Sequence, residues 1–353
     1  MSAEVLFSVS QTGVATIVLN RPKALNSLSH NMVTAIGEKL SEWKIDDNIS
    51  VVIIKGAGIK GLCAGGDIKA LYEARLSESA RQDAEHFFEK EYEVDMAVYQ
   101  FSKPIIACLD GIVMGGGVGL TYGASHRIVT ERTKWSMPEM NIGFFPDVGG
   151  AYFLNKAPGY LGRYLALTAS VINAADVLYM NGTDFYMESD HLERFIEKVE
   201  KTNWSTVEIE AQLNQLVDEF RTNPPEESKL RPYQKMIDAH FKFETLEEIL
   251  QSLKTEGSDF SMNVKEILLS KSPFSLKITL KQLVDGKQKT LKECFATDLL
   301  LAKKFLRHKD FFEGVRSVLI ERDQSPNYEY QHVSDVTDNV VNKIFQPTES
   351  IQL

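Results

Sequence analysis

Two acidic residues stand eight positions apart in the apolar segment from Met137 to Gly150, MPEMNIGFFPDVGG. Aromatic and aliphatic side chains flank Glu139 and Asp147 there, and Pro and Gly mark turns. Two carboxyl groups in a poorly solvated pocket titrate as a coupled pair with at least one raised pKa, which suits proton transfer or nucleophilic attack. The spacing leaves a plainer interpretation open, in which Asp147 caps a helix beginning near Val148 and Glu139 is a surface acid.

Two glycine-rich loops each follow an apolar stretch of the chain. The first, GLCAGGD, runs from Gly61 to Asp67, and the second, MGGGVG, runs from Met114 to Gly119. Glycine lets the backbone turn sharply and lets a ligand approach an N–H group, and a loop that leads into a helix directs its first amides at the ligand. Two such loops can donate two amides to one carbonyl oxygen, as in an oxyanion hole. In the alternative interpretation both loops are tight packing turns.

Other catalytic patterns are missing from the sequence. The second glycine loop fails the dinucleotide fingerprint, because Leu120 stands where GxGxxG requires its third glycine, and no GK[S/T] follows to make a P-loop. The seven histidines form no HExxH, and no GxSxG occurs. These absences argue against zinc and serine hydrolases, so we expect no metal site. Carboxylates and backbone amides would have to carry any hydrolysis.

The elements that must position these residues alternate between strand and helix in the first half of the chain. Short apolar or alternating stretches predict strands at 5–10, 14–19, 51–55, 105–109, 127–130 and 134–137. Amphipathic or capped stretches predict helices at about 29–43 and 78–101. Two more helices are expected after Asp67 and inside the second glycine loop. This alternation predicts an α/β fold. From about Leu192 the pattern becomes helical, with a linker or surface turn at Thr222–Ser228.

Composition and charge narrow the class of partner. The formal net charge of −10 argues against nucleic-acid binding, which needs a basic face. The three cysteines, Cys63, Cys108 and Cys294, form no CxxC and no disulfide framework, which favours a reducing compartment. No apolar run reaches the ~18 residues of a membrane helix. Neither a secretory signal nor a peroxisomal C-terminus is visible, so we expect a cytoplasmic (bacterial) protein, or an organelle-matrix protein if a targeting segment is missing from this chain.

Several motifs in the same order resemble a known superfamily. RPKALN at 21–26, CAGGD at 63–67 and GGGVGL at 115–120 resemble the signature loops of the crotonase (enoyl-CoA hydratase/isomerase) superfamily. More narrowly, MPEMNIGFFPDVGG at 137–150, SPFSLKITL at 272–280 and DFFEGVRSVLI at 310–320 resemble the 3-hydroxyisobutyryl-CoA hydrolases. The resemblance covers about residues 5–326. It implies an acyl-CoA thioester as substrate and no cofactor, since coenzyme A belongs to the substrate.

The resemblance also implies a role for each matching residue. Gly66 and Gly116 would donate the two amides to the thioester oxygen. Glu139 matches the carboxylate that the hydratases and hydrolases share, and Asp147 matches the second acid of the hydrolases. Glu91 matches an acid that contacts the hydroxyl end of the substrate, with Glu89 as the alternative if the register slips and a solvated helix face as the plainer interpretation. CoA would be bound, mostly through backbone, at Ala24, Leu25, Gly66, Ile68 and Lys69.

One departure from the superfamily pattern separates two reactions. The hydratases carry a second glutamate at the position that Gly119 takes here, and hydration uses both glutamates. The resemblance therefore implies hydrolysis of a short, branched 3-hydroxyacyl-CoA, as in valine breakdown, on a crotonase-type spiral of ββα units over residues 1–199, followed by a mostly helical region over 200–353. An enoyl-CoA hydratase or isomerase and a non-catalytic crotonase-like partner protein are the alternatives. The oligomeric state is left open.

Overall fold

The computed structural model describes residues 3–206 and 208–347. The chain divides into two compact units, each assembled from separate segments. Unit 1 comprises residues 1–66, 90–135 and 172–229, and unit 2 comprises residues 67–89, 136–171 and 230–353. Helix α3 (Glu78–Tyr99) contributes its first half to unit 2 and its second half to unit 1. The predicted division of the sequence at residue 199 stays a prediction.

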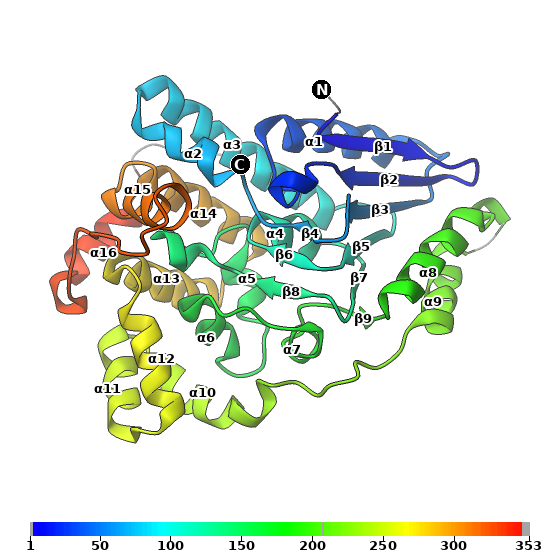
Figure 1. Ribbon diagram of the computed structural model, residues 1–353. Helices are drawn as coiled ribbons and strands as arrows, with labels where there is room; N and C mark the ends of the chain where they lie inside the picture. Colours follow the sequence, from blue (N-terminus) through cyan, green and yellow to red (C-terminus); the bar gives the residue numbers. More distant parts are fainter. Residues whose placement is uncertain (1–2, 207, 348–353) are drawn as a thin grey trace. The chain divides into compact units, whose positions relative to one another are not determined.

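Unit 1 is built on a six-stranded sheet in the order β1-β2-β3-β5-β7-β9 (Figure 1). Its strands are β1 (Val5–Val9), β2 (Val14–Leu19), β3 (Val51–Gly56), β5 (Ile105–Leu109), β7 (His126–Val129) and β9 (Phe185–Tyr186). β1 and β2 form an antiparallel hairpin, and all the later neighbours pair in parallel. The parallel strands are apolar over most of their length because side chains cover both faces of such a sheet.

A second, three-stranded sheet has the order β4-β6-β8, and its first two strands lead into the glycine loops. Its strands are β4 (Gly61–Cys63), β6 (Ile112–Met114) and β8 (Lys134–Ser136). The sequence indicated only a glycine-rich loop at Gly61–Asp67, so β4 was missed. Three residues that include a glycine give too short a pattern for a strand to be recognised. β4 and β6 pair in parallel, which places the two glycine loops at the ends of neighbouring strands.

Five α-helices of the described part of the chain lie wholly in unit 1 beside its sheets, and the one that begins after Ser29 was predicted from the sequence. They are α1 (His30–Ile45), α4 (Gly116–Tyr122), α7 (Ala174–Tyr179), α8 (Ser189–Lys201) and α9 (Ile209–Phe220), with short 3-10 turns at Pro22–Ala24 (η1) and Trp204–Thr206 (η4). Ser29 caps α1 by accepting a hydrogen bond from the amide of Met32, as predicted. Apolar residues of α8 and α9, such as Phe195 and Leu213, belong to the same buried cluster as Ile53 and Ile106 of the strands.

Unit 2 is helical. Its α-helices are α2 (Ile68–Tyr72), α5 (Gly150–Leu154), α6 (Leu161–Thr168), α10 (Gln234–Phe241), α11 (Leu246–Glu256), α12 (Asp259–Leu269), α13 (Pro273–Gly286), α14 (Leu291–Phe305), α15 (Lys309–Val315) and α16 (Asp338–Ile344). Short 3-10 turns are η2 (Glu73–Arg75), η3 (Glu139–Ile142), η5 (Arg231–Tyr233) and η7 (Val333–Asp335), and η6 (Arg316–Ile320) is a π-helix. Polar caps set several boundaries. Asp67 caps α2 as predicted, and Thr290 and Glu293 form a capping box at α14.

Candidate active site

The backbones of the two glycine loops of unit 1 lie directly beside each other. A Cβ atom at Gly65 would come within 3.5 Å of the Gly116 nitrogen, and a Cβ atom at Gly116 would come within 3.3 Å of the Gly66 nitrogen. The neighbouring Gly117 packs against Cys63, whose Cβ would lie 2.7 Å from an added Cβ atom. This close approach brings together the two amides that the sequence assigned to one carbonyl oxygen, and it leaves no room for side chains between them.

Glu91 borders the same loops from helix α3. Its side chain is 3 % exposed, and its Oε1 atom would lie only 2.2 Å from a Cβ atom at Gly116. The solvated-face interpretation of Glu91 is therefore wrong. The preceding part of α3 carries buried Phe87 and Phe88 one turn earlier, so Glu91 stands in an apolar stripe at helical spacing. A carboxyl group held beside a glycine loop can accept a hydrogen bond from a hydroxyl group of a bound ligand.

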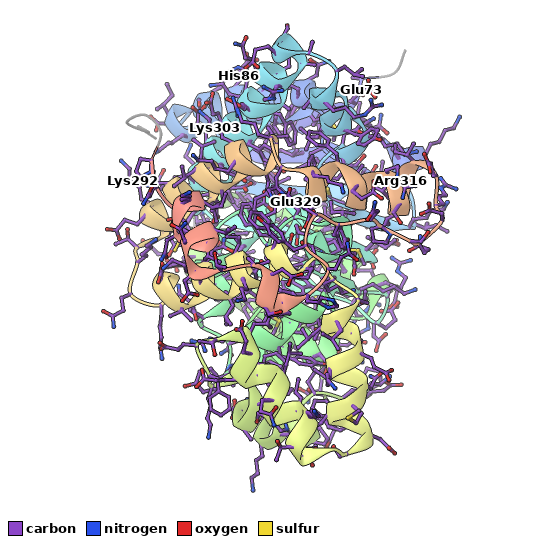
Figure 2. The ribbon with its side chains drawn as sticks, turned by 90° about the vertical axis from the view of Figure 1, so that its left-hand side faces the viewer. Glu73, His86, Lys292, Lys303, Arg316 and Glu329 are labelled. Atoms are coloured by element: carbon purple, nitrogen blue, oxygen red, sulfur yellow. The ribbon has the colours of Figure 1, made fainter. Side chains whose placement is uncertain are left out.

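Glu89, the alternative if the register slips, has a different environment in unit 2. Its carboxylate pairs with Lys303 at 2.8 Å and with His86 at 3.3 Å, and its side chain is 34 % exposed. Figure 2 shows His86 and Lys303 at the surface of their helices. Burial raises the pKa of the Glu89 carboxyl, but hydrogen bonds with Lys303 and His86 and their positive charges outweigh burial. The pKa of Glu89 is therefore below its usual value. Glu89 therefore makes surface ion pairs, and Glu91 is the better candidate.

The buried cysteine of the first loop is not activated as a nucleophile. Burial, with smaller contributions from the carboxyl groups of Glu91 and Asp95, raises the pKa of the Cys63 thiol to about 12. Asp95 lies one helical turn after Glu91 on α3 and is also 3 % exposed. A thiol in such surroundings stays protonated near neutral pH, so covalent catalysis by Cys63 is disfavoured.

Glu139 opens the 3-10 turn η3 in unit 2. It is 7 % exposed, so it is no ordinary surface acid. The turn ends at Gly143, whose φ of +65° is left-handed, and a Cβ atom there would lie 2.2 Å from the carbonyl oxygen of Asp310 at α15. Beyond Gly143, Phe144 and Phe145 pack against each other at 4.5 Å between ring centroids, so the segment after Glu139 is anchored in an aromatic core.

Asp147 follows this aromatic pair in a tight turn. It is 5 % exposed, and its carbonyl oxygen accepts a hydrogen bond from the Gly150 amide at 2.7 Å. Helix α5 begins at Gly150 with Gly149 as its N-cap and without a side-chain cap. The interpretation of Asp147 as a helix cap is therefore wrong. Its carboxyl group lies in a buried environment without being the N-cap of α5.

A third carboxyl group, not recognised in the sequence, stands behind the Asp147 turn. Asp298 of α14 is completely buried and accepts a hydrogen bond from the Gly149 amide at 2.8 Å. Gln282 of α13 donates to Asp298 at 2.7 Å and to the Pro146 carbonyl oxygen at 3.0 Å. Burial and the nearby Asp147 carboxyl raise the pKa of Asp298 to about 8. The sequence contained one indication of this residue, because Asp298 is a single acid on an otherwise apolar helix face.

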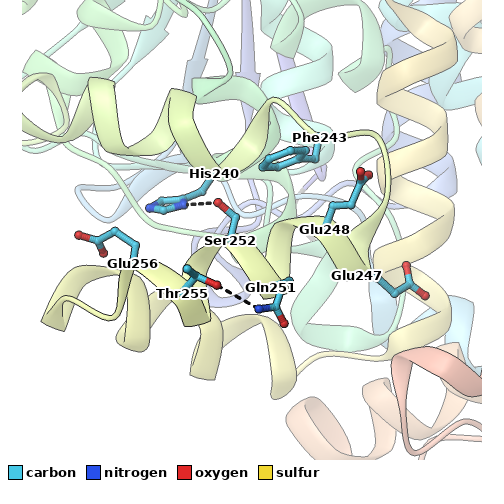
Figure 3. A pocket seen from close by; sticks show the side chains of 8 residues that line it. All are labelled: His240, Phe243, Glu247, Glu248, Gln251, Ser252, Thr255 and Glu256. Carbon is cyan, nitrogen blue, oxygen red and sulfur yellow. Dashed lines mark hydrogen bonds between the residues drawn. The ribbon is translucent and has the colours of Figure 1, made fainter.

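A separate hollow in unit 2 contains none of the predicted site residues. It encloses about 650 Å³ beside α10 and α11, and Figure 3 shows His240, Phe243 and Ser252 along it. The buried imidazole of His240 is bonded to Ser252 at 2.8 Å, and three glutamates, Glu247, Glu248 and Glu256, line the remainder. An acidic lining disfavours a polyanion such as CoA. Among residues 3–206 and 208–347, no cluster of His, Cys, Asp or Glu side chains has the arrangement of a metal site.

Comparison with known families decides the affiliation. The family model described as "Enoyl-CoA hydratase/isomerase" matches residues 14–345. The chain belongs to this family. Curated relatives narrow the comparison: the Danio rerio protein named "3-hydroxyisobutyryl-CoA hydrolase, mitochondrial" is 38% identical over 354 residues, covering 99% of this chain and 91% of that protein. The Homo sapiens protein of the same name is 39% identical over 344 residues, covering 97% of this chain and 88% of that protein.

Two solved structures share the fold over nearly the whole chain. A carnitinyl-CoA dehydratase from Mycobacterium thermoresistibile has a TM-score of 0.91 and 33% identity, covering 99% of this chain and 98% of the other. An enoyl-CoA hydratase from Rhodobacter sphaeroides has a TM-score of 0.88 and 29% identity, covering 98% of each chain. The crotonase-type α/β fold with a helical C-terminal region, expected from the sequence, is thereby confirmed.

The residues that the family resemblance assigned to CoA lie in both units. In unit 1, Ala24 is exposed and Leu25 is half-buried with a left-handed φ of +51°. The carbonyl oxygen of Leu25 accepts a hydrogen bond from the Ala64 amide at 3.0 Å, which ties this turn to the first glycine loop. In unit 2, Ile68 is half-buried and Lys69 is exposed at the start of α2. Their role in CoA binding stays a prediction.

Proposed function

We propose that this chain hydrolyses 3-hydroxyisobutyryl-CoA to the free acid and coenzyme A, with Glu139, Asp147, Gly66 and Gly116 as its catalytic residues. The chain is an acyl-CoA thioester hydrolase, and the reaction fits valine catabolism. The observation that carries this conclusion is the identity of 35–39% with 3-hydroxyisobutyryl-CoA hydrolases over at least 96% of the chain. The buried carboxyl groups and the glycine loops supply the chemistry that such a reaction needs.

The proposed reaction divides the work between amides and acids. The Gly66 and Gly116 amides bind the thioester oxygen, which becomes negative when the carbonyl group is attacked. Glu139 either attacks the carbonyl carbon to form a mixed anhydride or removes a proton from an attacking water. Asp147 orients the water, or exchanges protons with it and with the leaving thiolate. In the first route CoA leaves as the thiolate when the anhydride forms, and water then hydrolyses the anhydride to the free acid. In the second route the attacking water displaces CoA directly, and neither route needs a cofactor.

A hydratase or dehydratase reaction is the second candidate, because the solved relatives described above carry those names. Gly119 argues against it, since the resemblance places the second glutamate of hydratases at that position. The two reactions are separated by product. A thiol reagent detects CoA release from saturated 3-hydroxyacyl-CoA, whereas loss of the conjugated double bond reports hydration of an enoyl-CoA. Hydration without thiol release would overturn the hydrolase proposal and favour the hydratase.

Location and partners follow from the same comparison. The curated relatives named here are mitochondrial, and we propose an organelle matrix as the site of action. An acyl-CoA is the proposed small-molecule partner. Within the described part of the chain, no helix combines the length and apolarity that crossing a bilayer requires. The last four residues, SIQL, do not match a peroxisomal targeting signal, and they lie outside the described residues.

Glu91 gives a prediction on substrate choice. A site built to bond a hydroxyl group rejects an analogue that lacks it, because its buried polar group then loses a partner. We expect kcat/KM for 3-hydroxyisobutyryl-CoA to exceed that for isobutyryl-CoA by ~10²-fold or more. Glu91→Gln should reduce this ratio. The measurement is thiol release with each substrate under subsaturating conditions.

The matched control for Glu91→Gln is Glu89→Gln on the same helix. Glu89 makes exposed ion pairs, which contribute at most about 1 kcal/mol to stability. The substrate ratio should therefore be unchanged in this variant. Equal specificity constants for the two substrates in the wild-type protein would contradict a hydroxyl contact and indicate a general thioesterase.

A further inference from the structure

We propose that Asp298 is a positioning residue for Asp147, because its buried carboxyl group anchors the turn that carries Asp147 and places a second acid in electrostatic contact with it. This inference rests on the proposed function of Asp147. Asp298 accepts the Gly149 amide at 2.8 Å, and Gln282 links Asp298 to the Pro146 carbonyl oxygen. The contacts therefore fix the backbone on both sides of Asp147.

The turn needs such an anchor because its backbone is strained. Val148 has a φ of +49° and Gly149 has a φ of +79°, so two consecutive residues are left-handed. A β-branched residue such as valine rarely adopts this conformation, and the surrounding structure must hold it there. Val148 is 2 % exposed, and the Gly149 amide bonded to Asp298 comes directly after it. Losing that hydrogen bond removes the external constraint on the strained peptide.

The charges around Asp298 are few within the described residues. Asp147 faces it from the turn and opposes its ionisation, and Lys289, between α13 and α14, favours it. Cys294 on its own helix has a thiol pKa raised to about 12 by burial and stays neutral. Gln282 of α13 is uncharged. Burial and Asp147 outweigh the hydrogen bonds and Lys289, so Asp298 is mostly protonated at neutral pH and adds no negative charge beside Asp147.

The first test measures stability and does not depend on the reaction. The pKa of Asp298 in the folded protein, about 8, lies above its ordinary value of 3.8, so folding favours the protonated acid. The wild-type protein should therefore lose stability through this group as the pH rises from about 4 to about 8. Asp298→Asn cannot ionise. The difference in Tm, variant minus wild type, should become more positive over this pH range, and a difference that is constant with pH would overturn the electrostatic part of the proposal.

The second test measures catalysis in the same variant. An asparagine must direct its NH₂ group at either the Gly149 amide or Gln282, both of which are donors, so the turn should shift. We expect kcat to fall by ~10- to 10²-fold with little change in KM, because a small misplacement of a catalytic group affects the chemical step. The wild-type kcat should decline near pH 8, when Asp298 ionises and a second negative charge opposes charge development on the substrate. This decline should be absent in Asp298→Asn.

Two further variants keep the proposal falsifiable. Gln282→Met removes the donor to Asp298 and Pro146 but retains the acid, so it should lower kcat and keep a pH transition, even if Asp298→Asn does not fold. The transition should move to higher pH, because the Gln282 hydrogen bond lowers the pKa of Asp298. Asp285→Asn makes the same chemical change at a surface ion pair with Lys281 and should leave kcat unchanged. Wild-type kcat in both Asp298→Asn and Gln282→Met would overturn the positioning role. A wild-type protein that releases no thiol from any acyl-CoA would instead overturn the proposed function, while the stability test would still stand.

Discussion

Glu139→Gln is expected to lower thioester hydrolysis by more than ~10⁴-fold in a protein that remains folded and still binds CoA. The substitution keeps the shape of the side chain but removes its charge, and a nucleophile has no substitute, whereas loss of a proton shuttle costs ~10²–10⁴-fold. Glu139 is buried at the start of the 3-10 turn η3, so bulk water has little access to take over its role. Single-turnover thiol release and CoA affinity, measured separately, distinguish loss of chemistry from loss of binding.

Asp147→Asn is the comparison that separates the two acids. If Asp147 only orients water, the decrease should be smaller than that for Glu139→Gln. Repeated turnover in ¹⁸O-water adds a direct test, because label found in Glu139 identifies the anhydride route. Full activity in Glu139→Gln would contradict the mechanism. Full activity in both single variants and in the double variant would remove the proposed catalytic site.

Gly116→Val is expected to lower turnover by ~10²-fold or more, the loss typical of an impaired oxyanion hole. An added Cβ atom would lie 2.2 Å from the Glu91 Oε1 atom and 3.3 Å from the Gly66 nitrogen. The valine side chain must therefore displace Glu91 or occupy the space in front of the amides. Turnover with saturating substrate measures the effect, and circular dichroism checks that the variant is folded.

Thr121→Val is the matched control for this helix. Thr121 is buried in α4, and its hydroxyl group donates to the carbonyl oxygen of Gly117 at 2.8 Å. Valine keeps the shape and removes that bond, so a general disturbance of α4 would appear in both variants. Near-normal turnover in a folded Gly116→Val protein would contradict the assignment of the amide, and a matching loss in Thr121→Val would attribute the effect to the helix.

The fold was predictable where patterns were long or capped. The strands at Val51–Gly56 and Ile105–Leu109 and the helix after Ser29 agree with the structure because burial on both faces and a polar cap leave clear marks in the sequence. The three-residue strand β4 left no such mark, since its pairing with β6 depends on residues about 50 positions away. Pairing over that separation is set by tertiary structure, which a local pattern does not contain.

The candidate site was predictable in composition and only partly in environment. The spacing of residues in the sequence could not decide whether Glu91 and Glu139 were solvated. In the structure both side chains are buried. The apolar stripe of α3 could have indicated the burial of Glu91. Asp298 was overlooked because its neighbours at helical spacing, Cys294, Leu301 and Ala302, suggested an ordinary core helix. Its partner Gly149 is 149 positions earlier, and no motif joins the two.

That separation bears on how the protein is made. The amide of Gly149 meets its carboxyl partner only after α14 has left the ribosome, and β7 meets β9 only after Phe185 has been synthesised. Contacts between distant parts of a chain slow folding, because a long loop must close before they contribute. A nascent chain that ends near residue 290 contains both Glu139 and Asp147 but lacks Asp298. We therefore expect the turn that carries Asp147 to be loosely held in such a chain. Activity should therefore appear only late in synthesis.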